Sequence, residues 1–301
     1  MLRGIRSLTP LALLPVLAVA ACGGDKFPTP LEKAEGDVLT SYEDMMAFLG
    51  ELQAGTGAFT MVTIGNSVEG RSLVLLDFTG CGVGEGASAG DRVRVLMYAQ
   101  QHGNEPSGKE ASIALARDIA TGAFTGFLGS VDLYLIPQIN PDGSEARQRQ
   151  NGGGMDLNRD HLTLTTPEVQ ALHGVFRELM PEATLDVHEY GIAGRVWEEA
   201  GLHKHFGQQI DALTNPNMSE AVRTFALERM IPEMREKLAP RNVELHRYLV
   251  TDGPDARFRH STNALNDGRN GMGIYNSLSY LIEGRNGLTV EEDYGVIRSH
   301  G

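Results

Sequence analysis

Cysteine, tryptophan and positive charge are all scarce in this chain. Two cysteines, Cys22 and Cys81, and a single tryptophan stand among its 301 residues. Lys and Arg number 26 against 39 Asp and Glu, so the net charge at pH 7 is −13. Such an excess of acidic residues repels a phosphate backbone, and we therefore expect no nucleic-acid partner.

No hydrophobic stretch at the N-terminus is long enough to span a membrane. In "MLRGIRSLTPLALLPVLAVAAC" two arginines precede an apolar core of about a dozen residues, and small residues follow it. A membrane-spanning helix needs ~20 apolar residues. Residues 1–21 are therefore predicted to be an export signal.

The end of this signal, "LAVAAC", resembles the bacterial lipobox, in which the cysteine is lipidated and becomes the mature N-terminus. The resemblance implies a lipid on Cys22 that anchors the protein in the bacterial cell envelope, on the periplasmic side. Ordinary signal cleavage is the alternative. Cleavage would remove Arg3 and Arg6 and no acid, which changes the net charge from −13 to −15. With Cys22 lipidated, Cys81 would have no partner for an intrachain disulfide.

The rest of the chain divides into a short linker and one large domain. Residues 22–38 include "DKFPTPLEKAEGD", which is polar, contains two prolines and is predicted to be a linker that lifts the domain off the membrane. Residues 39–301 are predicted to be a single large domain, since a segment of this length can bury a substantial core.

Helical and strand-like patterns alternate along this domain. Helices are predicted near 40–55, with Gly55 as the stop, and near 109–124, 165–180 and 217–238. Strands are predicted near 58–65, 71–78, 92–99, 131–140, 183–190, 242–250 and 276–284. The order predicts an α/β fold, a three-layer α/β/α sandwich with a mixed, mainly parallel central sheet.

Two candidate metal ligands, His102 and Glu105, follow the predicted strand 92–99 in "QHGNE". Ligands of open α/β sheets collect beyond the carboxyl ends of strands, which suits this position. An H-x-x-E pair alone is weak evidence in a chain with nine histidines. A catalytic zinc commonly takes two His and one carboxylate, and His188, near the end of "LDVHEY", is the candidate for the third ligand.

The segment 136–160, "IPQINPDGSEARQRQNGGGMDLNRD", is the most informative part of the sequence. Its "NPDG" and "DLNR", together with "HGNE", a later strand-end histidine and a late glutamate, resemble the zinc carboxypeptidase family, the carboxypeptidase A-like metallopeptidases. The earlier "IGNSVEGRSL" is also similar to a segment of that family. These similarities run in family order from about residue 42 to residue 283.

The resemblance implies one zinc ion per chain, held by His102, Glu105 and His188. It implies that Asp156 of "DLNR" orients the first zinc histidine, a function that metal sites require. Asp156 capping a turn is the alternative.

Three further residues receive substrate functions from the resemblance. Arg149 would stabilise the oxyanion, with Arg147 as the alternative inward-pointing arginine. Asn158 and Arg159 would bind the terminal carboxylate of the substrate, which a guanidinium can hold through two hydrogen bonds.

Glu283, after the apolar strand "SLSYLI", matches the catalytic glutamate of the family. The resemblance implies a metallocarboxypeptidase that hydrolyses C-terminal peptide bonds with a zinc-activated water, Glu283 being the general base. A strand-end salt bridge with Arg285 is the structural alternative for Glu283. Other functions left open are a zinc-dependent N-acyl amino acid deacylase, of the succinylglutamate desuccinylase and aspartoacylase type, and a non-catalytic binding lipoprotein.

The sequence departs from the digestive carboxypeptidases just before Glu283. Those enzymes carry a tyrosine some twenty residues before the catalytic glutamate, whereas here the region reads "ARFRHSTNALNDGRNG". Tyr275 stands closer to the strand and is not assigned this function. The arginines of this region suggest that the substrate carries an anionic group such as a second carboxylate.

Overall fold

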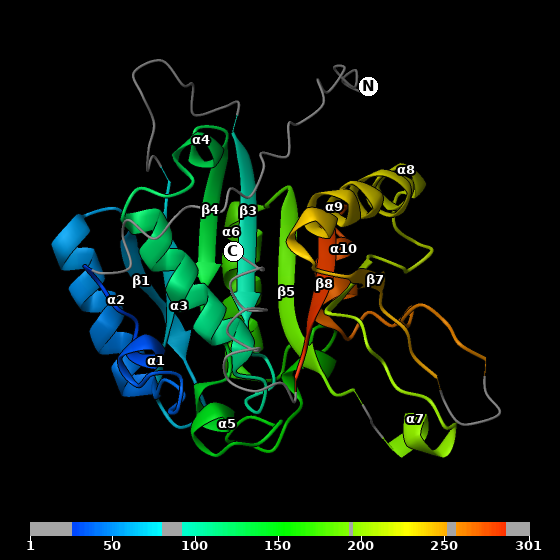
Figure 1. Ribbon diagram of the computed structural model, residues 1–301, viewed down its shortest axis with the longest axis horizontal. Helices are drawn as coiled ribbons and strands as arrows, with labels where there is room; N and C mark the ends of the chain where they lie inside the picture. Colours follow the sequence, from blue (N-terminus) through cyan, green and yellow to red (C-terminus); the bar gives the residue numbers. More distant parts are fainter. Residues whose placement is uncertain (1–25, 80–91, 193–194, 252–256, 287–301) are drawn as a thin grey trace.

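An eight-stranded mixed sheet forms the centre of the molecule (Figure 1). The computed structural model describes residues 26–79, 92–192, 195–251 and 257–286. The sheet has the order β1-β2-β4-β3-β5-β8-β6-β7. Its strands are β1 (Thr60–Asn66), β2 (Ser72–Asp77), β3 (Val93–Ala99), β4 (Val131–Ile136), β5 (Ala183–Tyr190), β6 (Gln208–Ala212), β7 (Leu245–Arg247) and β8 (Leu278–Arg285).

The helices of the described residues lie on both faces of the sheet and at its ends. The α-helices are α1 (Pro30–Lys33), α2 (Tyr42–Thr56), α3 (Ser107–Ala120), α4 (Thr125–Leu128), α5 (Pro141–Glu145), α6 (Pro167–Leu179), α7 (Arg195–Glu199), α8 (Glu220–Thr224), α9 (Ile231–Leu238) and α10 (Gly268–Gly273). A π-helical segment, Phe225–Met230, joins α8 to α9, and 3-10 turns stand at Leu157–Arg159 and Ala239–Arg241. Helices α2 and α3 cover one face, and α6 lies behind the sheet in Figure 1.

The core is divided by the sheet into two sides. Met97 and Leu96 are neighbours in β3, and their side chains therefore point to opposite faces. Met97 packs in a cluster with residues of α2 and α3, whereas Leu96 packs with residues of α6 and with Met272 of α10. A third cluster joins β6 and β8 to α9 through residues such as Ile210 and Ile231. The predicted three-layer α/β/α architecture is confirmed.

The central strands end at a common edge. Strands β4, β3, β5 and β8 are mutually parallel neighbours, so their carboxyl ends lie together, with α5 and α7 below them in Figure 1. Antiparallel pairs flank this block, β1 with β2 and β2 with β4 on one side and β6 with β8 on the other. The parallel block places the strand-end side chains of three separate segments at one edge.

The structure departs from the predicted elements near the N-terminus. Helix α2 runs past Gly55 and is ended by Gly57, whose φ of 63° suits the left-handed cap. Gly55 instead leaves room for Phe27, since a Cβ there would lie 2.7 Å from that ring. Phe27 and Leu31 are buried, so part of the predicted linker 22–38 packs onto the domain because its apolar side chains gain burial.

Strand β6 and helices α7 and α10 of the second half are absent from the predicted set. Helix α10 is glycine-rich, with the sequence "GRNGMG". Asp267 caps α10 by accepting a hydrogen bond from the backbone amide of Asn270 at 2.7 Å.

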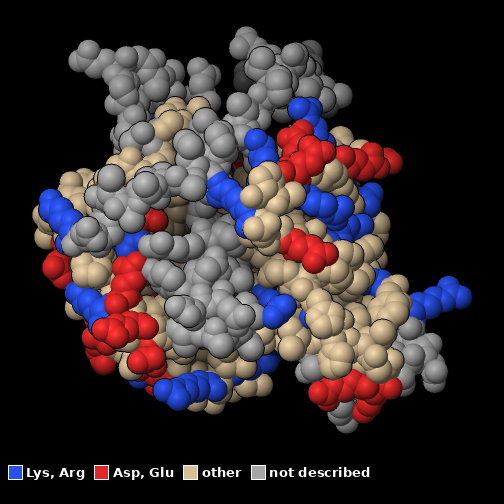
Figure 2. Space-filling view, viewed as in Figure 1, with Lys and Arg blue, Asp and Glu red and all other residues tan. Residues whose placement is uncertain are grey.

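Within the described residues, no helix combines the length and the hydropathy of a membrane span. Figure 2 shows acidic and basic side chains interspersed over α8 and α9 and acidic side chains gathered at α7. Cys22 and Cys81 lie outside the described residues.

Candidate metal centre

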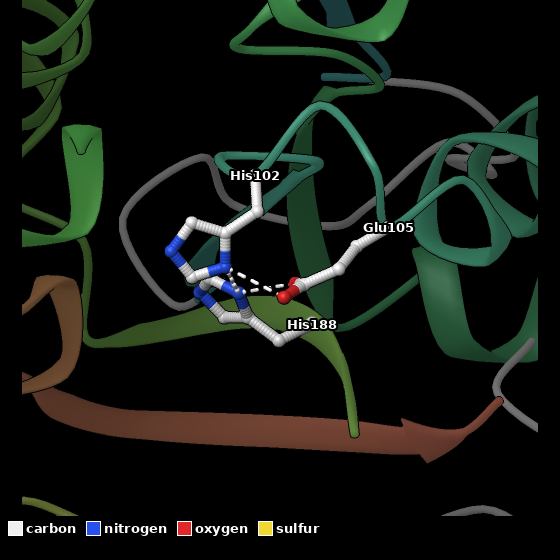
Figure 3. Close-up of side chains that lie close together, drawn as sticks. All are labelled: His102, Glu105 and His188. Atoms are coloured by element: carbon white, nitrogen blue, oxygen red, sulfur yellow. Dashed lines mark hydrogen bonds and ion pairs between the residues drawn. The ribbon is translucent and has the colours of Figure 1, made fainter. Parts of the chain in front are cut away.

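His102, Glu105 and His188 come together at the carboxyl edge of the sheet (Figure 3). His102 and Glu105 lie in the connection between β3 and α3, and His188 lies in β5. Their potential ligand atoms all lie within 4.8 Å of one another, and all three side chains are buried. These residues follow or end two strands that are separate in the sequence. The parallel pairing of β3 with β5 brings the ends of the two strands together.

The two imidazole rings present the same nitrogen to the centre. Nδ1 of His102 lies 2.7 Å from one oxygen of Glu105, and Nδ1 of His188 lies 2.8 Å from the other. The two Nδ1 atoms are 3.1 Å apart. Two nitrogens and a carboxylate that converge in this way form a donor set of the kind that catalytic zinc takes, and the residues therefore fit a zinc ion.

A carboxylate stands behind each histidine. Asp156 lies 3.2 Å from Nε2 of His102, and Asp186 lies 2.9 Å from Nε2 of His188. A carboxylate at Nε2 holds the proton there and leaves Nδ1 free to bind a metal. Asp186 was missed from the sequence. Its spacing of two from His188 was the available signal, because alternate strand residues share a face.

The electrostatics of the cluster suit a cation. Burial opposes the charged form of Glu105, but the two histidines outweigh it and hold the pKa of this carboxyl below its ordinary value. Burial likewise opposes charge on Asp156, yet His102 and Arg149 keep its pKa low. Burial also opposes protonation of His188, but Asp186 and Glu105 raise its pKa well above 6.5. Positive charge is therefore strongly favoured between these residues.

Arg149 lies beside the cluster. Its Nε donates to Asp156 at 2.9 Å, and its Nη1 lies 3.6 Å from Glu105. Arg149 lines the cavity that contains His102 and Glu105. Arg147, the alternative, is exposed and lines a separate hollow beside Ser144 and Glu145. The geometry favours Arg149 as the inward-pointing arginine.

Asn158 and Arg159 border the same cavity with different availability. The Asn158 amide nitrogen lies 3.2 Å from Nε2 of His188, and its oxygen accepts from the Gly268 amide at 2.7 Å. Arg159 is exposed and donates to the Asn158 carbonyl at 2.6 Å. Arg159 therefore has guanidinium nitrogens left for a ligand, whereas the side-chain oxygen of Asn158 already has a partner.

Glu283 faces the cluster from the adjacent strand. In the pairing of β5 with β8 it stands directly opposite His188, and it lines the cavity. Burial raises the pKa of Glu283 to about 8. No contact of Glu283 with Arg285 within 4 Å is seen in the described part of the chain. A buried carboxylate beside, but not within, the ligand cluster is the arrangement that a general base requires.

The cavity around these residues has a volume of about 360 Å³. Aromatic residues of the later segments, Tyr190, Trp197 and Tyr248, line its wall. The charge of Glu283 and burial raise the pKa of the Tyr248 hydroxyl. Tyr248 was not a candidate site residue in the sequence analysis, because it stands far from Glu283 along the chain. Tyr275, which was not assigned a function, is 48% exposed and lies against Phe176.

The chain is similar to known carboxypeptidases. Residues 45–190 match the family model described as zinc carboxypeptidase, a range that includes both histidines and Glu105. "Carboxypeptidase 2" of Trichophyton rubrum is 28% identical over 203 residues, which cover 64% of this chain and 37% of that protein. "Carboxypeptidase E" of Caenorhabditis elegans is 33% identical over 168 residues, which cover 50% of this chain and 35% of that protein. The chain thus spans little more than a third of the length of these curated relatives.

Solved structures share the fold. A metallo-carboxypeptidase from Burkholderia cenocepacia aligns with a TM-score of 0.67 at 19% identity, covering 87% of this chain and 67% of that one. A metallo-carboxypeptidase from Pseudomonas aeruginosa, in complex with (2-guanidinoethylmercapto)succinic acid, aligns with a TM-score of 0.62 at 23% identity, covering 84% and 66%. The chain is thus similar to zinc carboxypeptidases over residues 45–190, and it shares its fold with these metallo-carboxypeptidase structures.

Proposed function

We propose that this protein is a zinc-dependent metallocarboxypeptidase that hydrolyses C-terminal peptide bonds. The convergence of His102, Glu105 and His188 in one cavity with Glu283 on the adjacent strand is the observation that carries the proposal. The family match and the carboxypeptidase relatives support the choice of a peptide bond.

The three ligands would hold zinc, with Asp156 and Asp186 orienting the histidines. Zinc bound there would supply a water molecule of lowered pKa and polarise the carbonyl oxygen of the substrate. A divalent cation also favours the ionised form of Glu283, which is the form that accepts a proton.

Residues of the chain would transfer the proton, stabilise the oxyanion and bind the terminal carboxylate of the substrate. Glu283 takes a proton from the attacking water and returns it to the leaving amine. Arg149 lies beside the ligand cluster and stabilises the negative charge that develops on the carbonyl oxygen. Arg159, whose guanidinium is exposed in the cavity, binds the terminal carboxylate, and Asn158 shapes that subsite.

Replacement of the general base is the sharpest test of this function. We expect the wild-type protein and Glu283→Gln both to carry about one zinc per chain, because Glu283 is not a ligand. We expect hydrolysis of a C-terminal peptide panel by the wild type and a loss of at least about 10²-fold in the variant. Metal analysis and product detection by mass spectrometry measure both quantities.

Three other outcomes would contradict the proposal in distinguishable ways. Loss of zinc in Glu283→Gln would make this residue a ligand. Hydrolysis of N-acyl amino acids without hydrolysis of peptides would favour the deacylase. A zinc-loaded wild type that hydrolyses neither class would favour the binding lipoprotein.

A second part of the proposal concerns location. The lipobox-like "LAVAAC" supports a lipid on Cys22 and a position in the bacterial cell envelope, facing the periplasm. Peptides that reach that compartment would be the substrates.

A further inference from the structure

Lys204 is a buried lysine in the wall of the catalytic cavity. It lies between α7 and β6, and 7% of its surface is exposed. Its backbone amide donates to the Ile192 carbonyl at 3.0 Å, which ties this segment to the end of β5. Lysine is almost never fully buried without a partner, so this position calls for an explanation.

Three aromatic rings surround the Lys204 ammonium. Its Nζ lies 4.4 Å from the ring centre of Tyr190, 5.3 Å from that of Trp197 and 5.5 Å from that of Tyr248. The Tyr190 hydroxyl donates to the Phe206 carbonyl, which holds that ring in place. Aromatic faces attract a cation but do not replace its water as a carboxylate would. Burial therefore lowers the pKa of Lys204, while the charge of Glu283 opposes the shift.

The cations of the cavity fall into two groups. Arg149 pairs with Asp156 at 2.9 Å, and Arg269 pairs with Asp267 at 3.1 Å. Neither Arg159 nor Lys204 has a carboxylate within 4 Å among the residues that the structure describes. Among the described residues, the cavity thus offers two cationic groups without a carboxylate in direct contact.

Arg269, the one of the three arginines in "ARFRHSTNALNDGRNG" that lines the cavity, does not supply this charge. Arg269 is buried, donates to Ser261 and to the Thr262 carbonyl, and lies 3.8 Å from Asp211 in addition to its pair with Asp267. Its charge is therefore compensated by two acids within the fold. The anionic group that the sequence suggested for the substrate must find its cation elsewhere in the cavity.

We propose that Lys204 is a specificity-determining residue that binds a second carboxylate of the substrate, carried by one of the two residues that flank the scissile bond. The inference rests on the proposed function, in which Arg159 holds the terminal carboxylate. Lys204 and Glu283 line the same cavity, and Glu283 acts at the scissile bond, so the ammonium lies near the residues on either side of it. A substrate carboxylate would compensate a cation that is otherwise costly to bury.

Matched acidic and neutral substrates test the inference. Blocked dipeptides with Glu or its neutral isostere Gln, at the last or the penultimate position, are compared by kcat/KM. At one of these positions we expect the wild type to prefer Glu by about tenfold or more. We expect Lys204→Met, which keeps the length of the side chain, to bring this ratio close to one, and Lys204→Arg to retain most of it. Lys204→Gln, which is uncharged but polar, should behave as Lys204→Met does and replaces it if that variant fails to fold.

The result that would overturn the inference is a wild-type ratio near one at both positions, or a ratio that Lys204→Met and Lys204→Gln leave unchanged. An equal loss of activity on the Glu and Gln substrates would also overturn it, since Lys204 would then act through Glu283 alone. Calorimetry with N-acetylglutamate and N-acetylglutamine needs no turnover. About tenfold tighter binding of N-acetylglutamate by the zinc-loaded wild type, lost in Lys204→Met, would support the inference even if no peptide is hydrolysed. Equal binding of the two by the wild type would contradict it.

Discussion

Two glycines of the "HGNE" and "NPDG" segments are in direct contact. A Cβ on Gly103 would lie 2.0 Å from the carbonyl carbon of Gly143 and 2.3 Å from the Ser144 nitrogen. A Cβ on Gly143 would lie 2.3 Å from the Gln150 carbonyl oxygen. These are backbone atoms, so a side chain at either position must displace one of the two segments. The two short motifs are therefore two sides of one contact.

We expect Gly103→Ala to lose zinc and to destabilise the fold. The displaced segment carries His102 and Glu105, and overpacking against backbone costs about 2 kcal/mol or more. Metal analysis and urea denaturation measure the two effects. Gly174→Ala is the matched control, because it lies within α6 with open space around its Cα and should be neutral or slightly stabilising. A zinc-loaded Gly103→Ala as stable as the wild type would contradict this account.

At the scale of elements, a chain of buried hydrogen bonds joins α6 to the metal centre. His173 of α6 lies 3.0 Å from His161, which lies 2.7 Å from the oxygen of Gln101. The amide nitrogen of Gln101 donates to Asp186 at 2.8 Å, and Asp186 holds His188. Both His173 and His161 are buried. These hydrogen bonds hold Asp186 in place, and Asp186 in turn orients the ring of His188.

The two buried histidines should make the stability of the protein depend on pH. Burial lowers the pKa of His161 to about 3 and that of His173 to about 4, both below the ordinary 6.5. Between these pKa values and 6.5, the two histidines are therefore protonated in the unfolded chain and neutral in the folded protein. The contribution of these two histidines to the free energy of unfolding is fully present above pH ~6.5. It falls as the pH drops toward 4, by up to about 1.4 kcal/mol per pH unit for each histidine.

His173→Gln should lower the slope between pH 6.5 and 4.5 by up to about 1.4 kcal/mol per pH unit, since one of the two histidines no longer titrates. Urea denaturation of the metal-free protein measures it without a contribution from metal release. His203→Gln, at an exposed position, should leave the slope as it is. An unchanged slope in His173→Gln would show that these histidines do not carry the effect.

At the scale of the whole molecule, the folded domain begins close to the proposed lipid anchor. Phe27 and Leu31 pack against the domain, and Arg117 of α3 pairs with Glu32 at 2.5 Å. Residues 23–26 alone separate Cys22 from Phe27 in the sequence. A lipidated protein would thus be held near the membrane surface rather than on a long tether.

The anchor is tested with the full chain expressed in a bacterium. We expect the wild type in the membrane fraction, with an intact mass that includes lipid, and Cys22→Ala in the soluble fraction of the envelope. A wild-type protein without lipid that begins at residue 22 or later would contradict lipidation and favour ordinary signal cleavage.

Local patterns were sufficient to predict most elements and to single out the candidate metal ligands. Strand periodicity placed β3, β5 and β8 correctly, and the motifs named His102, Glu105 and His188 before any contact was visible. Helix α10 and strand β6 were missed because both are short and depend on tertiary contacts, such as the hydrogen bond from the backbone amide of Gly268 in α10 to Asn158. Such segments have too little intrinsic preference for a pattern to reveal them.

The sequence by itself determined the fold class, the family resemblance and the types of residue that could bind zinc, because periodicity and motif spacing are local properties of the chain. The tertiary structure alone decided which charges remain available. Arg269 and Lys204 are both cations in one cavity, yet Asp211 and Asp267 neutralise the first, and three aromatic rings surround the second. Those neighbours come from distant segments, and only the folding of the sheet brings them together.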